Sequence, residues 1–390
     1  MAEAYIVAVA RSAGGKRGGR LADVHPADLA GRILAALVER SGIDPALVED
    51  VIMGCACPGG EQGANIARNA VLASGLPESV PGTHVDRQCG SSQQALHFAA
   101  ATVMSGVMDV VIAAGVESMT RVPMGLPWTL AAKHGFGTYR SPGIEARYPD
   151  TLFSQFGGAE MMAAKYGLTR DVLDAYALES HKRAAAATQA GKFEAEIVPL
   201  EVVTPEGETV IHKVDEGIRF DATIERIAGV KLLQEGGVIT AANASQICDG
   251  AAAVLVVNEA GLKALGLTPL ARIHQMTVIG HDPVIMLEAP VPATQKALAK
   301  AGLTIGDIDL YEVNEAFAPV PLAWAQALDA DPAKLNVHGG AIALGHPLGG
   351  SGAKLMATLV SALHDRGARY GLQTMCEAGG MANVTIVERL

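Results

Sequence analysis

Two parts of the chain alternate short apolar segments with longer Ala-rich ones, and this alternation constrains the fold more than any other feature. The first part has segments typical of strands at 5–9, 48–53, 83–86 and 109–114, and segments typical of helices at 27–40, 65–73 and 91–104. Alternating strands and helices indicate βαβ units. We therefore expect an α/β protein with a mostly parallel sheet that helices cover on both faces.

A second series of the same kind fills the C-terminal part of the chain. A predicted strand at 251–257 resembles the strands of the first part. Further strands are predicted at 270–279, 308–313, 372–376 and 383–388, and helices at 293–301, 316–328 and 352–364. Val48–Met53 precedes a turn at Cys89, as Ile308–Val313 precedes a turn at His346. This correspondence indicates two similar halves.

The segment between the two series has a different composition. Residues 120–150 are rich in Pro, Gly and aromatic residues without clear periodicity, 159–190 predict two helices, and 197–240 predict short strands with a hairpin through Pro205-Glu206-Gly207. We interpret 119–245 as an inserted α+β loop domain that covers the functional site. The N-terminal half then comprises 1–118, completed by 246–268, and the C-terminal half comprises 269–390.

Composition excludes several classes of function. The 390 residues carry a net charge of −11 with no basic cluster beyond Lys16-Arg17, which argues against a nucleic-acid partner. No apolar run approaches the length of a membrane span, and the N-terminus lacks a signal pattern. The five cysteines form no paired framework and suggest no metal site, so we expect a cytoplasmic protein without membrane insertion.

Three residues far apart in the sequence indicate a catalytic function. Cys89 follows a polar turn at the predicted start of a helix, where backbone amides and the helix dipole favour the thiolate. His346 and Cys376 each lie in a glycine-rich turn. Together they suggest acyl transfer through a cysteine thioester. Taken singly, a buried thiol can be a small apolar residue, and a loop histidine can be satisfied by backbone groups.

Four segments, in this order, resemble the thiolase family, the acetyl-CoA acetyltransferases and 3-ketoacyl-CoA thiolases. They are Asp-Arg-Gln-Cys-Gly-Ser (86–91), Asn-Glu-Ala-Phe-Ala (314–318), Gly-Gly-Ala-Ile-Ala-Leu-Gly-His-Pro-Leu-Gly (339–349) and Cys-Glu-Ala-Gly-Gly (376–380). The resemblance covers nearly the whole chain. It implies the thiolase fold, in which two duplicated βαβ-type halves form a layered α-β-α-β-α core.

The resemblance also implies a role for each site residue. Cys89 would carry the acyl group, His346 would accept the Cys89 proton, and Cys376 would serve as the second acid and base. One oxyanion hole would use His346 with a water held by Asn314, although an Asn there can also cap a helix. The other would use the backbone amides of Cys89 and Ala378. Family members usually have Gly at the latter position, so a positive φ there would strain this chain.

The implied small molecules are CoA and acyl-CoA, used as substrates without a metal or redox cofactor. Arg219 and Ser245 stand where the family contacts CoA, although a solvated Arg and a helix-capping Ser are equally consistent with the sequence. The Gly-rich loop at 14–19 lacks the P-loop spacing and is interpreted as a turn. We expect a homodimer or homotetramer.

The implied reaction is thiolysis of 3-oxoacyl-CoA to acetyl-CoA and a shortened acyl-CoA through acyl-Cys89. Its reverse is the Claisen condensation of acetyl-CoA to acetoacetyl-CoA. Phe153–Glu160 replaces the His-Met-Gly stretch of acetoacetyl-specific members, which favours a degradative range of longer or sterol-derived substrates. Two alternatives stay open: a decarboxylating ketoacyl synthase, which would lack Cys376, and a non-catalytic thiolase-like protein that binds acyl-CoA or lipid.

Overall fold

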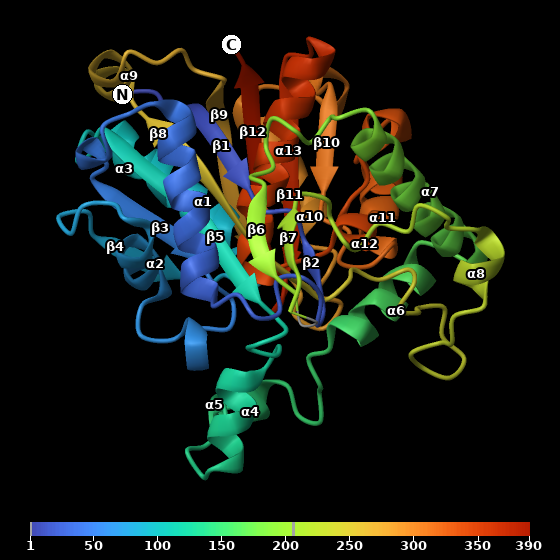
Figure 1. Cartoon of the computed structure of the whole chain (residues 1–390). Coiled ribbons are helices and arrows are strands. Elements are labelled where there is room, and N and C mark those ends of the chain that lie inside the picture. Colours follow the sequence, from blue (N-terminus) through green and yellow to red (C-terminus); the bar gives the residue numbers. More distant parts are fainter. Residues whose placement is uncertain (1, 205–206) are drawn as a thin grey trace.

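The computed structural model describes residues 2–204 and 207–390 (Figure 1). Within them, the largest sheet has ten strands, nine of which follow the order β10-β11-β12-β9-β1-β8-β5-β3-β4, while the short β2 pairs with β8. The strands are β1 (Tyr5–Arg11), β2 (Gly15–Lys16), β3 (Asp50–Gly54), β4 (Gly82–Val85), β5 (Val110–Ser118), β8 (Cys248–Val257), β9 (Ala271–Gly280), β10 (Leu310–Val313), β11 (Tyr370–Glu377) and β12 (Met381–Arg389).

The sheet consists of two matching halves that meet at a narrow seam. Only Tyr5 and Ile6 of β1 pair with β9. Outward from the seam, the order β1-β8-β5-β3 on one side corresponds to β9-β12-β11-β10 on the other. The pairs β3–β5 and β10–β11, which correspond in the two halves, are both parallel. The observed strand order therefore supports the predicted duplication.

The expectation of a mostly parallel sheet is wrong, because the sheet is mixed. β8 is antiparallel to both β1 and β5, and β12 is antiparallel to both β9 and β11. The reason lies in the connections. Only residues 378–380 join β11 to β12, too few for the crossover that a parallel pair requires. β8 enters the N-terminal half only after the long segment that follows β5.

Helices form layers on both sides of each half and between them. α3 and α13 contact each other and strands of both halves, so they form the middle layer, while α1 and α2 pack on the outer face of the N-terminal strands and α10 on that of the C-terminal strands (Figure 1). This arrangement confirms the layered α/β core. The helices of these layers are α1 (Pro26–Ser41), α2 (Ile66–Ser74), α3 (Ser91–Ser105), α10 (Pro290–Ala301), α11 (Pro319–Leu328) and α13 (Ser351–Arg366).

The N-termini of α3 and α13 are in direct contact. A Cβ placed on Gly352 would lie 2.2 Å from the backbone nitrogen of Gln93, so only glycine permits this approach. The Ala353 N–H donates to Ser92 Oγ (2.9 Å), and Gln93 Nε2 donates to the Gln373 carbonyl of β11 (3.2 Å). These buried contacts bring together the residues just before α3, just before α13 and at the end of β11.

The segment between β5 and β8 has its own small elements. The predicted hairpin is confirmed by the antiparallel pair β6 (Leu200–Val203) and β7 (Thr209–His212), although Pro205 and Glu206 of its turn lie outside the described residues. The two predicted helices are α6 (Gln155–Lys165) and α7 (Arg170–Gln189). The remaining helices of the chain are α4 (Leu126–Lys133), α5 (Pro142–Arg147), α8 (Ile224–Ala228), α9 (Glu259–Leu265) and α12 (Ala341–Leu344).

Sequence periodicity missed α4 and α5. They project away from the layered core at the bottom of Figure 1, and neither helix has a fully buried residue. A helix without a buried face has no need of an apolar stripe, so the pattern that normally reveals a helix is absent. The division into 1–118 with 246–268, 119–245 and 269–390 stays a prediction.

Candidate active site

Cys89 lies in a tight turn between β4 and α3. Gln88 has a φ of +51°, a left-handed conformation that is uncommon for a residue with a side chain. The Ser91 hydroxyl holds this turn, because it donates to the Gln88 carbonyl (2.6 Å) and accepts from the Arg87 N–H (2.9 Å). The strained turn therefore fixes the position of the Cys89 thiol.

The expected stabilisation of a Cys89 thiolate by the helix N-terminus is not found. Burial raises the pKa of the Cys89 thiol well above its ordinary value, and the nearby Cys376 and Glu377 raise it further through their charges. Desolvation and two neighbouring acids thus outweigh the helix dipole, which stabilises a charge by about 2 kcal/mol at most. The resting side chain is a neutral thiol that needs a base.

His346 is the sequence-predicted candidate for that base, and its contacts decide which ring nitrogen carries a proton. Its Nδ1 contacts the Ser351 hydroxyl, which itself donates to the Pro347 carbonyl (2.9 Å). The Ser351 oxygen is therefore left to accept from Nδ1–H, and Nε2 carries the basic lone pair. Burial, followed by the charge of Lys354, lowers the pKa of His346 to about 3, so the imidazole is neutral at physiological pH.

Asn314 follows β10 and faces His346. Its Nδ2 lies 3.4 Å from His346 Nε2. The side chain does not cap α11, which begins only at Pro319 with Ala318 as its N-cap. The buried Oδ1 of Asn314 has no hydrogen-bond partner within the part of the chain that the structure describes. An unpartnered buried acceptor is the group that a bound water would satisfy.

Cys376 lies near the end of β11, with its thiol in the interior. Burial, with a contribution from Glu377, raises its pKa to about 12. The turn that follows is not strained at Ala378, whose φ is not positive. The left-handed conformations fall instead on Gly379 (φ +84°) and Gly380 (φ +74°). The departure from the family pattern at 378 is therefore compatible with the backbone of this turn.

Glu377 is a site residue that sequence reasoning missed. Its carboxyl packs so closely on Gly90 that a Cβ there would lie 1.9 Å from Oε1. Neither oxygen has a hydrogen-bond partner among the described residues. Burial raises the pKa of Glu377 to about 8, although the charge of Arg87 opposes this shift. The two thiols thus share their surroundings with a third acid that titrates near physiological pH.

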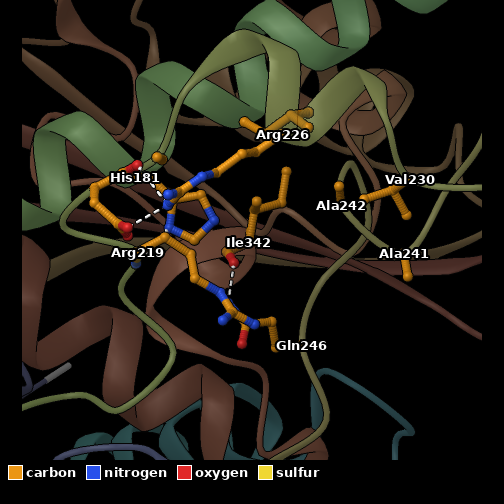
Figure 2. Close-up of a pocket in the computed structure, with 11 residues that line it drawn as sticks. His181, Arg219, Arg226, Val230, Ala241, Ala242, Gln246 and Ile342 are labelled. Carbon is orange, nitrogen blue, oxygen red and sulfur yellow. Dashed lines mark hydrogen bonds and ion pairs between the residues drawn. The ribbon is translucent and has the colours of Figure 1, made fainter.

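A separate pocket of about 470 Å³ lies beside this centre (Figure 2). His181, Arg219 and Arg226 gather on one side, and Val230, Ala241 and Ala242 lie on the other. The Arg219 N–H donates to His181 Nδ1 (3.1 Å). Burial and the charge of Arg219 lower the pKa of His181 to about 4, so the histidine is neutral. The cationic side therefore carries two arginines, one of which, Arg226, is paired with Asp221.

Gln246 connects this pocket to the loop that carries His346. It lines the pocket, and its side chain donates to the carbonyls of Gly217 (2.8 Å) and Ile342 (2.7 Å). Its own backbone carbonyl accepts from the His346 N–H (3.1 Å). Ser245 is half-buried, with its N–H donating to Ala316, and it caps no helix in the described structure. It is adjacent to Gln246 but does not itself line the pocket.

Several of these residues had no signal in the sequence. Lys354, Gln246, His181 and Arg226 lie against groups far away in the chain, which no local pattern reveals. Ser351 is only five residues from His346, but their contact depends on how the turn between them folds. Glu377 had one available signal, because a charged residue immediately after a candidate catalytic cysteine is unusual within a buried strand. That the Glu377 carboxyl has no hydrogen-bond partner among the described residues could be seen only in the folded structure.

Among residues 2–204 and 207–390, no group of three or more His, Cys, Asp or Glu side chains is placed to hold a metal ion. In the same residues, no helix combines the length and apolar character that crossing a bilayer requires.

Replacing Glu377 by glutamine is expected to stabilise the protein in a pH-dependent way. The folded pKa of about 8 exceeds the ordinary value of 4.5, so the wild type loses stability as the pH rises between these values. Glutamine cannot ionise. The advantage of Glu377→Gln should therefore be small at pH 4.5 and reach the order of 4 kcal/mol at pH 8, since one pKa unit corresponds to about 1.4 kcal/mol.

Urea unfolding at several pH values measures this difference. Glu145→Gln serves as the control, because Glu145 is exposed and a hydrogen bond from Arg140 lowers its pKa rather than raising it. A constant difference between Glu377→Gln and wild type across this pH range would show that Glu377 does not titrate in it.

Family models and known relatives cover the whole of this architecture. The thiolase N-terminal domain matches residues 4–260 and the thiolase C-terminal domain matches residues 267–389. A steroid 3-ketoacyl-CoA thiolase of Mycobacterium tuberculosis is 52% identical over 395 residues, which cover 100% of this chain and 95% of the relative. An acetyl-CoA acetyltransferase of Cupriavidus necator is 41% identical, with 100% of both chains covered.

A solved structure agrees with these matches. The crystal structure of human mitochondrial 3-ketoacyl-CoA thiolase superposes with a TM-score of 0.90 at 36% sequence identity, covering 100% of this chain and 99% of the other. The family models, the relatives and the solved structure thus all match this chain over both halves of the sheet and the segment between them. The chain belongs to the thiolase family.

Proposed function

We propose that this protein is a CoA-dependent acyltransferase that cleaves 3-oxoacyl-CoA thioesters by thiolysis, through an acyl group carried on Cys89. One observation supports this most strongly. Two buried thiols of separate chain segments, Cys89 and Cys376, lie close enough for Cys376 to raise the pKa of Cys89. The same chain holds a buried contact between His346 and Asn314 (3.4 Å), which can supply a base. A hydrolase or a carrier would need only one of these thiols.

The first half of the reaction breaks the carbon–carbon bond. His346 Nε2 takes the proton from the Cys89 thiol, and the sulfur attacks the 3-keto carbon. The bond between the α-carbon and the 3-carbon then breaks, leaving an acyl thioester on Cys89 and the enolate of acetyl-CoA. Cys376 donates its thiol proton to that α-carbon, which releases acetyl-CoA.

The second half transfers the acyl group to CoA. The Cys376 thiolate takes the proton from the CoA thiol, and the CoA sulfur attacks the acyl-Cys89 carbonyl. Cys89 leaves and recovers its proton from the His346 imidazolium, so every group returns to its resting state. The reversed sequence joins two acetyl-CoA molecules in a Claisen condensation.

Both halves of the reaction place negative charge on an oxygen atom of the substrate, and this charge requires preorganised hydrogen-bond donors. We propose His346 Nε2–H and a water held by Asn314 for the enolate, and the amides of Cys89 and Ala378 for the acyl intermediate. The unpartnered Asn314 Oδ1 supports the water, because it is a buried acceptor for which no partner occurs among the described residues. The unstrained backbone at Ala378 supports the second set.

CoA is the obligatory small molecule, as a substrate, and we place its nucleotide part in the pocket of Figure 2. Arg219 and Arg226 supply the positive charge that phosphates require in an otherwise acidic protein. Ser245, next to Gln246, is proposed to contact the pantetheine arm. These pocket residues come largely from 119–245, which supports a covering role for that segment. That no metal or redox cofactor is needed stays a prediction.

A degradative substrate range is the proposal that best fits this chain. The steroid thiolase of M. tuberculosis is 52% identical, whereas the acetyl-CoA acetyltransferase is 41% identical. The segment 153–160 lacks the His-Met-Gly stretch of acetoacetyl-specific members. We therefore propose longer or ring-bearing 3-oxoacyl chains, including sterol-derived ones, as the preferred substrates.

Assembly and location are also proposals. β4 is the outermost strand of its half, with one side unpaired in the described structure, and Phe98 is exposed beside it. An unpaired edge strand favours pairing with a second copy, which supports a homodimer, or a homotetramer built from dimers. We propose a cytoplasmic location, because the five cysteines are unpaired thiols in the described residues, as in a reducing compartment.

A panel of 3-oxoacyl-CoA substrates tests the proposed function. We expect long-chain or ring-bearing substrates to be cleaved with a kcat/KM about tenfold or more above that of acetoacetyl-CoA, since their apolar chains contribute extra binding energy. Loss of the 3-keto thioester absorbance measures cleavage. Intact CoA binding without cleavage of any substrate would instead indicate a non-catalytic acyl-CoA-binding protein.

Substitution of the two thiols should separate the two chemical roles. Cys89→Ala is expected to abolish acylation and cleavage together. Cys376→Ser should still accept an acyl group from a simple acyl-CoA, while cleavage falls by about 10²-fold or more, because only the carbon acid–base step is lost. Intact-protein mass measures acylation, and Cys57→Ser controls for replacement of a buried thiol. Equal loss of both steps in Cys376→Ser would contradict the assignment.

Charge removal in the pocket should affect CoA binding rather than chemistry. Arg219→Ala is expected to raise the KM for CoA about tenfold with little change in kcat, because the contact is the same in ground and transition states. Arg226→Ala should have a smaller effect, since Asp221 already neutralises Arg226. Arg147→Ala, an exposed arginine of α5, is the control. A normal KM in Arg219→Ala would place the nucleotide elsewhere.

A further inference from the structure

A cluster of buried charged side chains lies behind the loop that carries His346. Arg11 of β1 pairs with Glu196 (2.6 Å) and with Asp215 (3.0 Å). Lys354 of α13 pairs with the same Asp215 (3.3 Å). All four side chains are at most 6% exposed. The cluster therefore ties β1, the segment between β5 and β8, and α13 together without contact with solvent.

Lys354 also reaches the backbone just before His346. Its Nζ donates to the carbonyl of Leu344 (2.5 Å) and lies 3.4 Å from the carbonyl of Gly345. Gly345 has a φ of +80°, and the Cys248 sulfur packs so closely on it that an added Cβ would lie 2.6 Å away. The ammonium thus holds two carbonyls of a turn that has little freedom to move.

The same ammonium acts on the imidazole through its charge. A protonated His346 would lie near a buried cation, and the low polarity of the interior makes that repulsion costly. After burial, Lys354 is the cause that lowers the pKa of His346. Asp215 is the counter-ion of this ammonium: burial opposes the ionisation of the carboxyl, but the charges of Arg11 and Lys354 outweigh burial and lower the pKa of Asp215 to about 2.

We propose that Lys354 is a positioning residue for His346: its ammonium holds the carbonyls of the turn at 344–345 and places a buried positive charge near the imidazole, so that Nε2 stays free to accept the Cys89 proton. This inference rests on the proposed role of His346 as the base. It adds a residue on another helix, whose counter-ion, Asp215, lies four residues before the pocket residue Arg219. The position of the base is thereby linked to the segment that lines the CoA pocket.

Other ionisable groups face Lys354 and His346. From β8, burial raises the pKa of Cys248 to about 12, so this thiol is neutral at physiological pH. From β10, burial raises the pKa of Glu312 well above its ordinary value, and this side chain lines a small cavity with Lys354. Arg11 and Glu196 complete the cluster, and neither is among the groups that shift the pKa of His346.

Replacing Lys354 by methionine tests the proposal through a pH profile. Without the cation the pKa of His346 should rise, so the acid limb of Cys89 acylation should move to higher pH. The acylation rate at pH 7 should also fall by about tenfold or more, because the turn loses its donor. Lys354→Gln keeps a donor but not the charge, and it should show the shifted limb with a smaller loss of rate at high pH.

Two controls separate this role from simple destabilisation. Thr358→Val removes the Thr358–Glu196 hydrogen bond (2.8 Å), one turn further along α13 in the same cluster, and should leave the acid limb in place. Lys354→Arg keeps the positive charge, so the acid limb of its pH profile should lie at the same pH as that of the wild type. An equal loss at every pH in Lys354→Met, as in Thr358→Val, would overturn the proposal.

Hydrogen exchange at the imidazole C2 of His346, followed by mass spectrometry across pH, reads its pKa without catalysis. We expect the midpoint to be higher in Lys354→Met and Lys354→Gln than in wild type; an unchanged midpoint in both would overturn the electrostatic role. If wild-type protein forms no acyl-Cys89, the proposed function fails, yet the exchange profile still decides whether Lys354 controls the protonation of His346.

Discussion

The contact between the N-termini of α3 and α13 is the constraint on which the rest of the site depends. Gly352 lets the two helices approach until a single added carbon would collide with the backbone of Gln93. Side chains of Ser92, Gln93 and Gln373 then bind α3, α13 and β11 to each other. Cys89, His346 and Cys376 stand near the ends of these three elements, so a contact in the middle layer sets the relative positions of the three proposed catalytic residues. The duplicated sheet supplies the two halves, and this layer aligns them.

Burial is the second determinant, since it sets the charge state of every group in the centre. The two thiols are kept protonated and His346 is kept neutral. A resting site of neutral groups can then create charge only by transferring a proton between two of them. Because the interior is poorly polarisable, each new charge must meet a prepared donor. We propose Asn314 and the amides of Cys89 and Ala378 for that role, whereas the cation of Lys354 opposes positive charge on His346.

The fold was largely predictable from local patterns, and the exceptions have identifiable causes. Apolar alternation located the strands and the long helices of both halves, because these elements bury one face or two. It missed α4 and α5, which bury none, and it suggested a mostly parallel sheet, because alternation does not record the direction in which β8 and β12 run. Direction follows from the connections, and the three-residue link before β12 is short enough to decide it.

The sequence by itself determined the family, the layered fold and the identity of four candidate catalytic residues, because each stands in a short motif whose residue types are chemically specific. Tertiary structure alone decided how those residues behave. Cys89 has the location predicted for an activated thiolate but not the predicted charge, since desolvation depends on atoms from other segments. Glu377 and Lys354 became visible only when distant elements were packed together, and Ser351 only when the turn between it and His346 was folded. The physical reason is range: motifs encode neighbours along the chain, whereas pKa values and hydrogen bonds depend on neighbours in space.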